Sequence, residues 1–190
     1  MNTVVQISNV TKTFGERPAL KGVGFSVPEH SIFGVLGPNG AGKTTLFSCM
    51  AGFFPYDEGE IVIFGENDPE KLKGRMSILP QDALFQSNIP IIDQLTFFLR
   101  LMGRSKQEAV REVIQVLELV ELTDVMERES TTLSHGMYKR LALAQAFLGN
   151  PKLIILDEPT AGLDFKSAKQ IRELIKKLQA EATLLVSSHN

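Results

Sequence analysis

Apolar residues early in the chain and near its end fall into short runs bounded by glycine and proline. Three runs rich in Val, Ile and Phe predict the strands of a small, largely antiparallel sheet: Val4–Val10, Gly24–Val27 and Glu60–Phe64. Three others are continuously apolar, which is typical of parallel strands buried on both faces: Ile32–Leu36, Leu153–Asp157 and Ala182–His189. The pattern therefore predicts two kinds of sheet.

The middle of the chain has the spacing of helices instead. Ser105 and Glu108 form a capping box, which predicts that a helix begins there. Apolar residues then recur at helical spacing at Ala109, Val110, Val113, Val116, Leu117 and Val120, and later at Ile171, Leu174, Ile175 and Leu178. This order predicts an α/β fold with a mainly parallel core sheet. The core (1–86 and 151–190) is expected to carry a small N-terminal antiparallel β-subdomain, and a helical subdomain (87–150) is expected to be inserted into it.

The most apolar stretch, Ile89–Gly103, is interrupted by Asp93 and Arg100 and is shorter than the roughly 20 residues that cross a bilayer. We expect a helix packed in the helical subdomain, with a partner surface at its edge as the alternative. With 20 basic and 22 acidic residues the net charge is −2, which does not favour nucleic acid as a partner. The single cysteine, Cys49, and the absence of a signal-peptide pattern predict a cytoplasmic protein.

The sequence GPNGAGKTT follows the Ile32–Leu36 run directly and precedes a helical run. Its spacing, G-x-x-x-x-G-K-[ST], is that of a P-loop, in which backbone N–H groups at a helix N-terminus surround phosphate oxygens. The alternative, a glycine-rich turn without a ligand, does not explain the strand-to-helix context. We expect Lys43 to contact the β- and γ-phosphates and Thr44 to bind Mg²⁺. The whole predicted cradle is Gly37, Pro38, Asn39, Gly40, Ala41, Gly42, Lys43, Thr44 and Thr45.

Two neighbouring acids, Asp157 and Glu158, end the apolar run Leu153–Asp157. In isolation they could equally be a solvated turn. Beside a P-loop, Asp157 is expected to present its carboxylate to the Mg²⁺ site. Glu158 is expected to orient or deprotonate a water in line with the γ-phosphate. Cys49, just behind the loop, is expected to be a small buried apolar group.

Taken together with further motifs, the chain resembles the nucleotide-binding subunits of ABC transporters from about Val5 to its end. Gln81, after SILP, matches the family's Q-loop glutamine, and this implies contact with Mg²⁺ and communication with a membrane partner. Phe14 matches the aromatic residue that stacks on adenine. Asp164 in AGLD matches the D-loop, and His189 matches the switch histidine that contacts the γ-phosphate.

The segment LSHGM occupies the place of the family signature, LSGGQ, and comprises Ser134, His135, Gly136 and Met137 after Leu133. The resemblance implies that this segment binds the γ-phosphate held by a second ATP-binding subunit, so that two chains enclose two ATP molecules head to tail. His135 adds bulk and a titratable ring beside a phosphate, and either effect could dominate. Met137, together with the P-loop sequence, favours an exporter.

The resemblance also implies the partners and location of the protein. A transmembrane permease is expected to hold the subunit peripherally at the inner face of the cell membrane. The candidate dock is the apolar surface around Leu84, Phe85 and Ile89–Ile92, and an internal packing surface is an equally favoured interpretation of these residues. The family domain normally continues beyond the switch histidine, so its C-terminal end is expected beyond Asn190. Two alternatives stay open: a soluble ABC ATPase without a transport role, and a weakly hydrolysing partner in a heterodimer.

Overall fold

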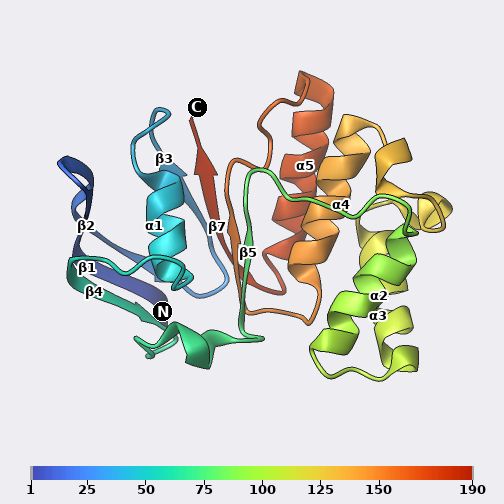
Figure 1. Ribbon diagram of the computed structural model, residues 1–190, viewed down its shortest axis with the longest axis horizontal. Helices are drawn as coiled ribbons and strands as arrows, with labels where there is room; N and C mark the ends of the chain where they lie inside the picture. The colour runs from blue at the N-terminus through green and yellow to red at the C-terminus, as the bar shows by residue number, and fades with distance from the viewer. Residues whose placement is uncertain (1, 190) are drawn as a thin grey trace.

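Two sheets form the framework of the computed structural model, which describes residues 2–189 (Figure 1). The antiparallel sheet has the order β2-β1-β4: β1 (Thr3–Phe14), β2 (Arg17–Pro28) and β4 (Glu58–Ile63). The parallel sheet has the order β3-β7-β6-β5: β3 (Ile32–Leu36), β7 (Thr183–Ser188), β6 (Leu153–Leu156) and β5 (Met76–Leu79). Both predicted sheets and the α/β class are confirmed.

The helix α1 (Lys43–Met50) lies between the two sheets. Its apolar side chains join one core cluster with β1, β2 and β4 on one side and with Leu153, Ile155 and Leu185 on the other. The alternating residues Ile154 and Leu156 belong instead to a second cluster with the remaining long helices. Successive side chains of a strand point to opposite faces, which explains why β6 is buried along its whole length.

Four further helices share the second core cluster: α2 (Ile91–Leu101), α3 (Lys106–Leu119), α4 (His135–Phe147) and α5 (Phe165–Leu178). The helices α4 and α5 lie beside the parallel sheet, and α2 and α3 lie on the far side of α4 (Figure 1). Three short 3₁₀ turns connect the elements: η1 (Pro69–Leu72), η2 (Thr123–Val125) and η3 (Ser130–Thr132). The predicted capping box is confirmed, since Ser105 and Glu108 each accept a hydrogen bond from the other's backbone N–H. The α5 residues predicted to share one face are all buried.

The prediction that β3 is buried on both faces is wrong. β3 is an edge strand of the parallel sheet, so it lacks a strand on one side among the described residues. Phe33 and Val35 pack on the core, but Ile32 and Leu36 point to the other face and are 37% and 70% exposed. An apolar run shows that a segment is a strand, whereas its burial depends on its place in the sheet.

The apolar stretch Ile89–Gly103 forms α2 and its flanks. Ile91, Leu95 and Leu99 are buried in the second cluster, as expected for a packed helix, whereas Phe97 and Leu101 are exposed. Within residues 2–189 no helix combines the length and apolar character that crossing a membrane requires. Cys49 is buried, as predicted.

Candidate functional site

The predicted cradle connects β3 to α1 at the edge where the parallel strands end (Figure 1). Gly42 is the N-cap of α1 and has φ +91°, a left-handed conformation that favours glycine. A Cβ there would also lie 2.4 Å from the carbonyl oxygen of Ala19 in β2. The second glycine of the motif is therefore required both by its backbone angle and by the close approach of β2.

Lys43, the first residue of α1, is buried and folds back over the loop. Its ammonium donates to the carbonyl oxygens of Gly37 at 2.6 Å and Pro38 at 3.2 Å. It also lies 3.1 Å from Oε1 of Glu158. Burial alone would raise the pKa of Glu158, but the ammonium of Lys43 and the ring of His189 outweigh it, so this pKa lies below its ordinary value. Glu158 is therefore held as a carboxylate.

Asp157 is buried and hydrogen-bonded at both carboxylate oxygens. The Thr44 hydroxyl donates to Oδ2 at 2.6 Å, and the Ser187 hydroxyl donates to Oδ1 at 2.5 Å. Ser187 also accepts from the backbone N–H of Glu158 at 2.8 Å. Thr44 and Asp157 thus lie in contact. The role of Ser187 was missed by the sequence reasoning, although a serine inside an apolar run is the signal that could have found it.

Glu158 has φ +49°, which is uncommon outside glycine and places strain directly at the site. Its Oε2 lies 3.3 Å from Nδ1 of His189, the last residue described. Lys43, Glu158 and His189 therefore form a chain of contacts across the ends of α1, β6 and β7. The structure thus brings together predicted residues from three motifs that are far apart in sequence.

A cavity of about 280 Å³ opens beside these groups. It is lined by Ala19, Asn39, Gly40, Ala41, Gly42, Lys43, Thr44, Thr45, Gln81 and Glu158. Gln81 comes from the end of β5, so the cavity joins the predicted cradle to the predicted Q-loop glutamine. Its size and donors suit the phosphate end of a nucleotide.

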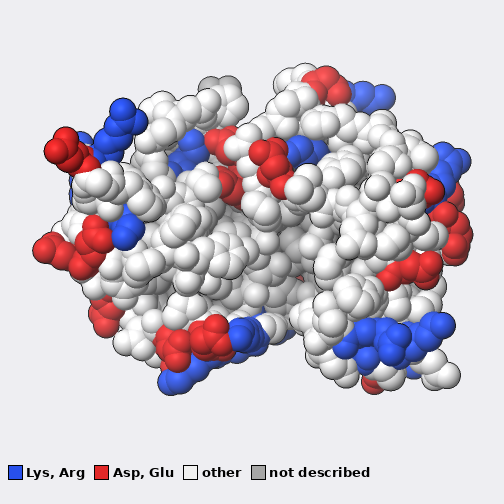
Figure 2. Space-filling view, in the orientation of Figure 1, with Lys and Arg blue, Asp and Glu red and all other residues white. Residues whose placement is uncertain are grey.

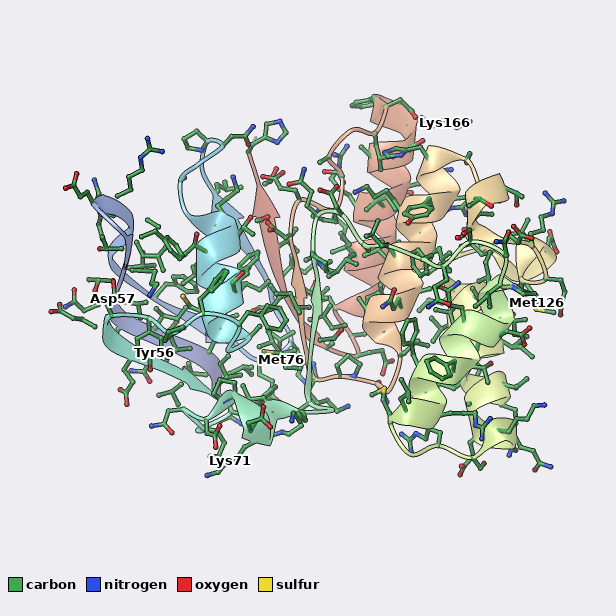
Figure 3. The ribbon with its side chains drawn as sticks, in the orientation of Figure 1. Tyr56, Asp57, Lys71, Met76, Met126 and Lys166 are labelled. Atoms are coloured by element: carbon green, nitrogen blue, oxygen red, sulfur yellow. The ribbon has the colours of Figure 1, made fainter. Side chains whose placement is uncertain are left out.

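Phe14 lies at the turn between β1 and β2, five residues before the cavity-lining Ala19. Its ring is 46% exposed and packs edge-on against Phe54 at a centroid distance of 5.7 Å. The Lys12 ammonium lies 5.4 Å from the centre of the Phe14 ring. Lys12 is itself held by Asp57 at 2.9 Å, on the loop labelled at the left of Figure 3. Phe14 is thus an exposed aromatic surface supported from two sides.

The predicted signature lies at the start of α4, outside the cavity lining given by the described residues. Ser134 is the N-cap, and its hydroxyl accepts from the N–H of Met137 at 3.3 Å. Nε2 of His135 lies 3.4 Å from the position that a Cβ on Gly162 would take. The corresponding Cβ of Gly136 would lie 3.3 Å from the Ser167 hydroxyl. The signature therefore packs against the start of α5 in the same chain.

Asp164, the predicted D-loop residue, is the N-cap of α5. It accepts from the N–H groups of Lys166 at 2.9 Å and Ser167 at 3.0 Å, and from the Ser167 hydroxyl at 2.6 Å. The Ser167 hydrogen bonds lower the pKa of Asp164. Lys166 marks this end of α5 in Figure 3, at the same edge of the molecule as the end of β7 in Figure 1.

Comparison with known proteins gives a consistent picture. The family model described as ABC transporter matches residues 20–161. The linearmycin resistance ATP-binding protein LnrL of Bacillus subtilis is 34% identical over 98% of the chain and 61% of its own length. The spermidine/putrescine import ATP-binding protein PotA of Roseobacter denitrificans is 34% identical over 98% of the chain and 52% of its own length.

Among solved structures, cbiO1 of Clostridium perfringens, described as part of the ABC transporter complex cbiONQ, superposes with a TM-score of 0.90 at 27% identity. The match covers 100% of this chain and 80% of that one. The chain spans about three fifths of the length of the first of these curated relatives. With a family model that matches well over half of its residues, the chain belongs to the ABC transporter family.

Proposed function

We propose that the chain binds and hydrolyses ATP as the nucleotide-binding subunit of an ABC transporter. This proposal rests on two contacts, Lys43 with Glu158 and Thr44 with Asp157, beside a cavity that Lys43, Thr44 and Glu158 line. A cation, a buried carboxylate and a loop of backbone N–H groups are the groups that phosphoryl transfer to water requires. The relatives named for import and for resistance support a transport role and leave the direction open.

Lys43 and Glu158 would change partners when nucleotide binds. A γ-phosphate in the cradle competes with Glu158 for the Lys43 ammonium, because both are anions within reach of one buried cation. Released from Lys43, Glu158 becomes a stronger base and accepts a proton from the water that attacks the γ-phosphorus. The bond from that phosphorus to the bridging oxygen breaks, and ADP and phosphate leave. His189 is proposed to contact the γ-phosphate while remaining beside Glu158.

The residues at this edge fit a magnesium ion. Thr44 and Asp157 present a hydroxyl and a carboxylate that already lie in contact, and Gln81, whose side chain carries an amide oxygen, lines the same cavity as Thr44. These are the hard oxygen donors that Mg²⁺ prefers. Within residues 2–189 no group of three or more acidic, histidine or cysteine side chains is arranged to hold a metal ion by itself. Bound Mg²⁺ would neutralise charge on the phosphate oxygens.

The remaining predicted residues are proposed to act between two chains. The signature residues Ser134–Met137 start α4 with backbone N–H groups that favour an anion, and they lie apart from their own chain's cavity. A head-to-tail pair would bring them to the nucleotide of the partner chain. The chain is proposed to divide into a core (1–86 and 151–190) and a helical part (87–150), because α2, α3 and α4 all fall within the second segment.

The permease is proposed to dock in a groove between β5 and the helices. Two neighbouring cavities of about 300 and 260 Å³ share Ser77 and Gln145, and the exposed Leu84 lines one of them. Buried Oε1 of Gln145 has no hydrogen-bond partner among the described residues. Figure 2 shows a wide uncharged area in the middle of this face, which β5 and the segment after it cross in Figure 1. Of the predicted dock, Ile91 is buried in the core instead.

The test is ATP turnover per chain as a function of protein concentration, with Mg²⁺ present. We expect the rate per chain to rise with concentration, and to be lost in Glu158→Gln and Lys43→Ala. A wild-type rate in Lys43→Ala would refute the assignment. Background turnover by a chain that still binds ATP would favour a heterodimer with a non-identical partner. Detergent co-purification with a co-expressed permease, and its loss in Leu84→Asp, tests the dock.

A further inference from the structure

The segment that follows β5, residues 81–86, has no helix or strand, yet side chains of the helical part hold its backbone. The Tyr138 hydroxyl of α4 donates to the carbonyl oxygen of Ala83 at 2.9 Å and accepts from the N–H of Phe85 at 3.3 Å. The rings of Tyr138 and Phe85 also pack edge to face at 5.3 Å. One hydroxyl, acting as both donor and acceptor, therefore fixes two points of the segment.

Three other side chains hold the two ends of the segment. The Lys139 ammonium, next to Tyr138 on α4, donates to the carbonyl oxygen of Gln81 at 2.8 Å. The side chain of Gln94 in α2 accepts from the N–H of Gln86 at 2.7 Å and donates to its carbonyl oxygen at 3.3 Å. Ser130 donates to that same carbonyl oxygen at 3.4 Å. The segment is thus bound to α2, α4 and the turn before α4.

The backbone just upstream is bound to the core sheet instead. β5 pairs with β6 up to Leu79, whose carbonyl oxygen accepts from the N–H of Asp157 at 2.9 Å. The change from core to helices therefore occurs across Pro80, between Leu79 and Gln81. Gln81 lines the nucleotide cavity, but its backbone is attached to α4.

On the basis of the proposed function, we infer that Tyr138 and Lys139 are positioning residues for Gln81. They directly follow the signature Ser134–Met137 on α4, so one rigid helix carries both the signature and the two side chains that hold the segment after β5. By fixing the Gln81 carbonyl, Lys139 sets the direction in which the Gln81 amide enters the cavity.

The experiment uses the whole chain with Lys139→Met, Lys139→Arg and Tyr138→Phe. Lys169→Met, at an exposed position of α5, and Tyr56→Phe, the chain's other tyrosine, are matched controls. Hydrogen exchange without nucleotide reports the amides of residues 82–86 directly. Isothermal titration with a non-hydrolysable ATP analogue, at stepped Mg²⁺ concentrations, reports how the Gln81 amide is presented.

We expect exchange at residues 82–86 to accelerate at least threefold in Lys139→Met and in Tyr138→Phe, and to stay unchanged in both controls. The Mg²⁺ concentration for half-maximal analogue binding should rise roughly three- to tenfold in Lys139→Met, which corresponds to the net contribution of one ordinary hydrogen bond. Lys139→Arg, which keeps a hydrogen-bond donor, should retain the wild-type Mg²⁺ concentration for half-maximal binding. Affinity for the analogue without Mg²⁺ should change less than twofold.

Wild-type Mg²⁺ dependence in Lys139→Met, or unchanged exchange in both variants, would overturn this inference while leaving the proposed function intact. An equal loss of affinity with and without Mg²⁺, not restored by Lys139→Arg, would also overturn it and show a general structural defect. A wild-type chain that binds no analogue would instead overturn the proposed function on which the inference rests.

Discussion

Replacing Ser187 with alanine removes a hydroxyl that connects the two acids of the site. Ser187 is 1% exposed; its hydroxyl donates to Oδ1 of Asp157 at 2.5 Å and accepts from the N–H of Glu158 at 2.8 Å. Alanine leaves one buried carboxylate oxygen and one buried N–H without this partner. Each unsatisfied buried group costs about 1–3 kcal/mol. We expect Ser187→Ala to lower the free energy of unfolding by about 2–6 kcal/mol.

For a chain of this length, 1 kcal/mol shifts the melting temperature by roughly 2–4 °C, so the variant should melt about 4–24 °C below the wild type. Thermal unfolding followed by circular dichroism, without nucleotide and at neutral pH, measures this shift. Ser26→Ala, at an exposed position of β2, is the control and should stay within about 0.5 kcal/mol of the wild type. A Ser187→Ala protein that melts within 2 °C of the wild type would refute the reasoning.

A double-mutant cycle assigns the effect to the hydrogen bond with Asp157. If Ser187 acts through this carboxylate, Ser187→Ala should be less destabilising by at least about 1 kcal/mol in an Asp157→Ala background. The remaining effect would belong to the contact with the Glu158 N–H. Additive effects of the two substitutions would show that the contact with Asp157 does not contribute, whatever its geometry.

Three other predictions concern backbone strain, helix capping and pH. Gly59→Ala should lower the free energy of unfolding, measured in urea, by more than about 3 kcal/mol, because φ is +94° and the Cβ would lie 2.4 Å from a backbone oxygen of β1. Its control is Gly15→Ala, where φ is +58° and the Cβ would meet open space, and this change should cost only about 1 kcal/mol. Ser105→Ala should cost about 1 kcal/mol in the same assay by removing the cap of α3, and an unchanged midpoint would contradict this. The ionised Glu158 stabilises the fold fully above its ordinary pKa of about 4.5, and this contribution is lost as pH falls through its lowered folded value. Between pH 6 and 3.5, the free energy of unfolding measured in urea should therefore fall less steeply with decreasing pH in Glu158→Gln than in the wild type. Equal slopes of this free energy against pH would count against the lowered pKa.

Features that depend on neighbours in sequence could be predicted from the sequence. The capping box at Ser105 needs only residues three apart, and the P-loop needs only a strand, nine residues and a helix. The apolar runs indicated strands for the same reason. Burial of β3 was wrongly predicted because it depends on the strand order β3-β7-β6-β5, which no local pattern contains.

Contacts between distant segments could not be predicted in this way. In the sequence, Tyr138 and Lys139 are ordinary residues of an amphipathic helix. Their contacts with the segment after β5 exist only because the fold places α4 beside that segment. The effect of His135 is of the same kind. Its ring and the backbone of Gly162 share one small space, so the consequence of replacing the family's glycine at position 135 depends on a turn 27 residues away.

The register of the parallel sheet assembles the site from these distant parts. β6 and β7 pair with Leu156 beside Val186, so the residues just beyond, Asp157 and Ser187, emerge at the same level and meet. A shift of β7 by one residue would turn every side chain of that strand to the opposite face and would remove this contact. The same shift would displace His189 from Glu158. The geometry of both acids therefore depends on a hydrogen-bond ladder whose register is set by the buried apolar residues Leu184 and Leu185, which lie on opposite faces of β7 and pack into separate cores.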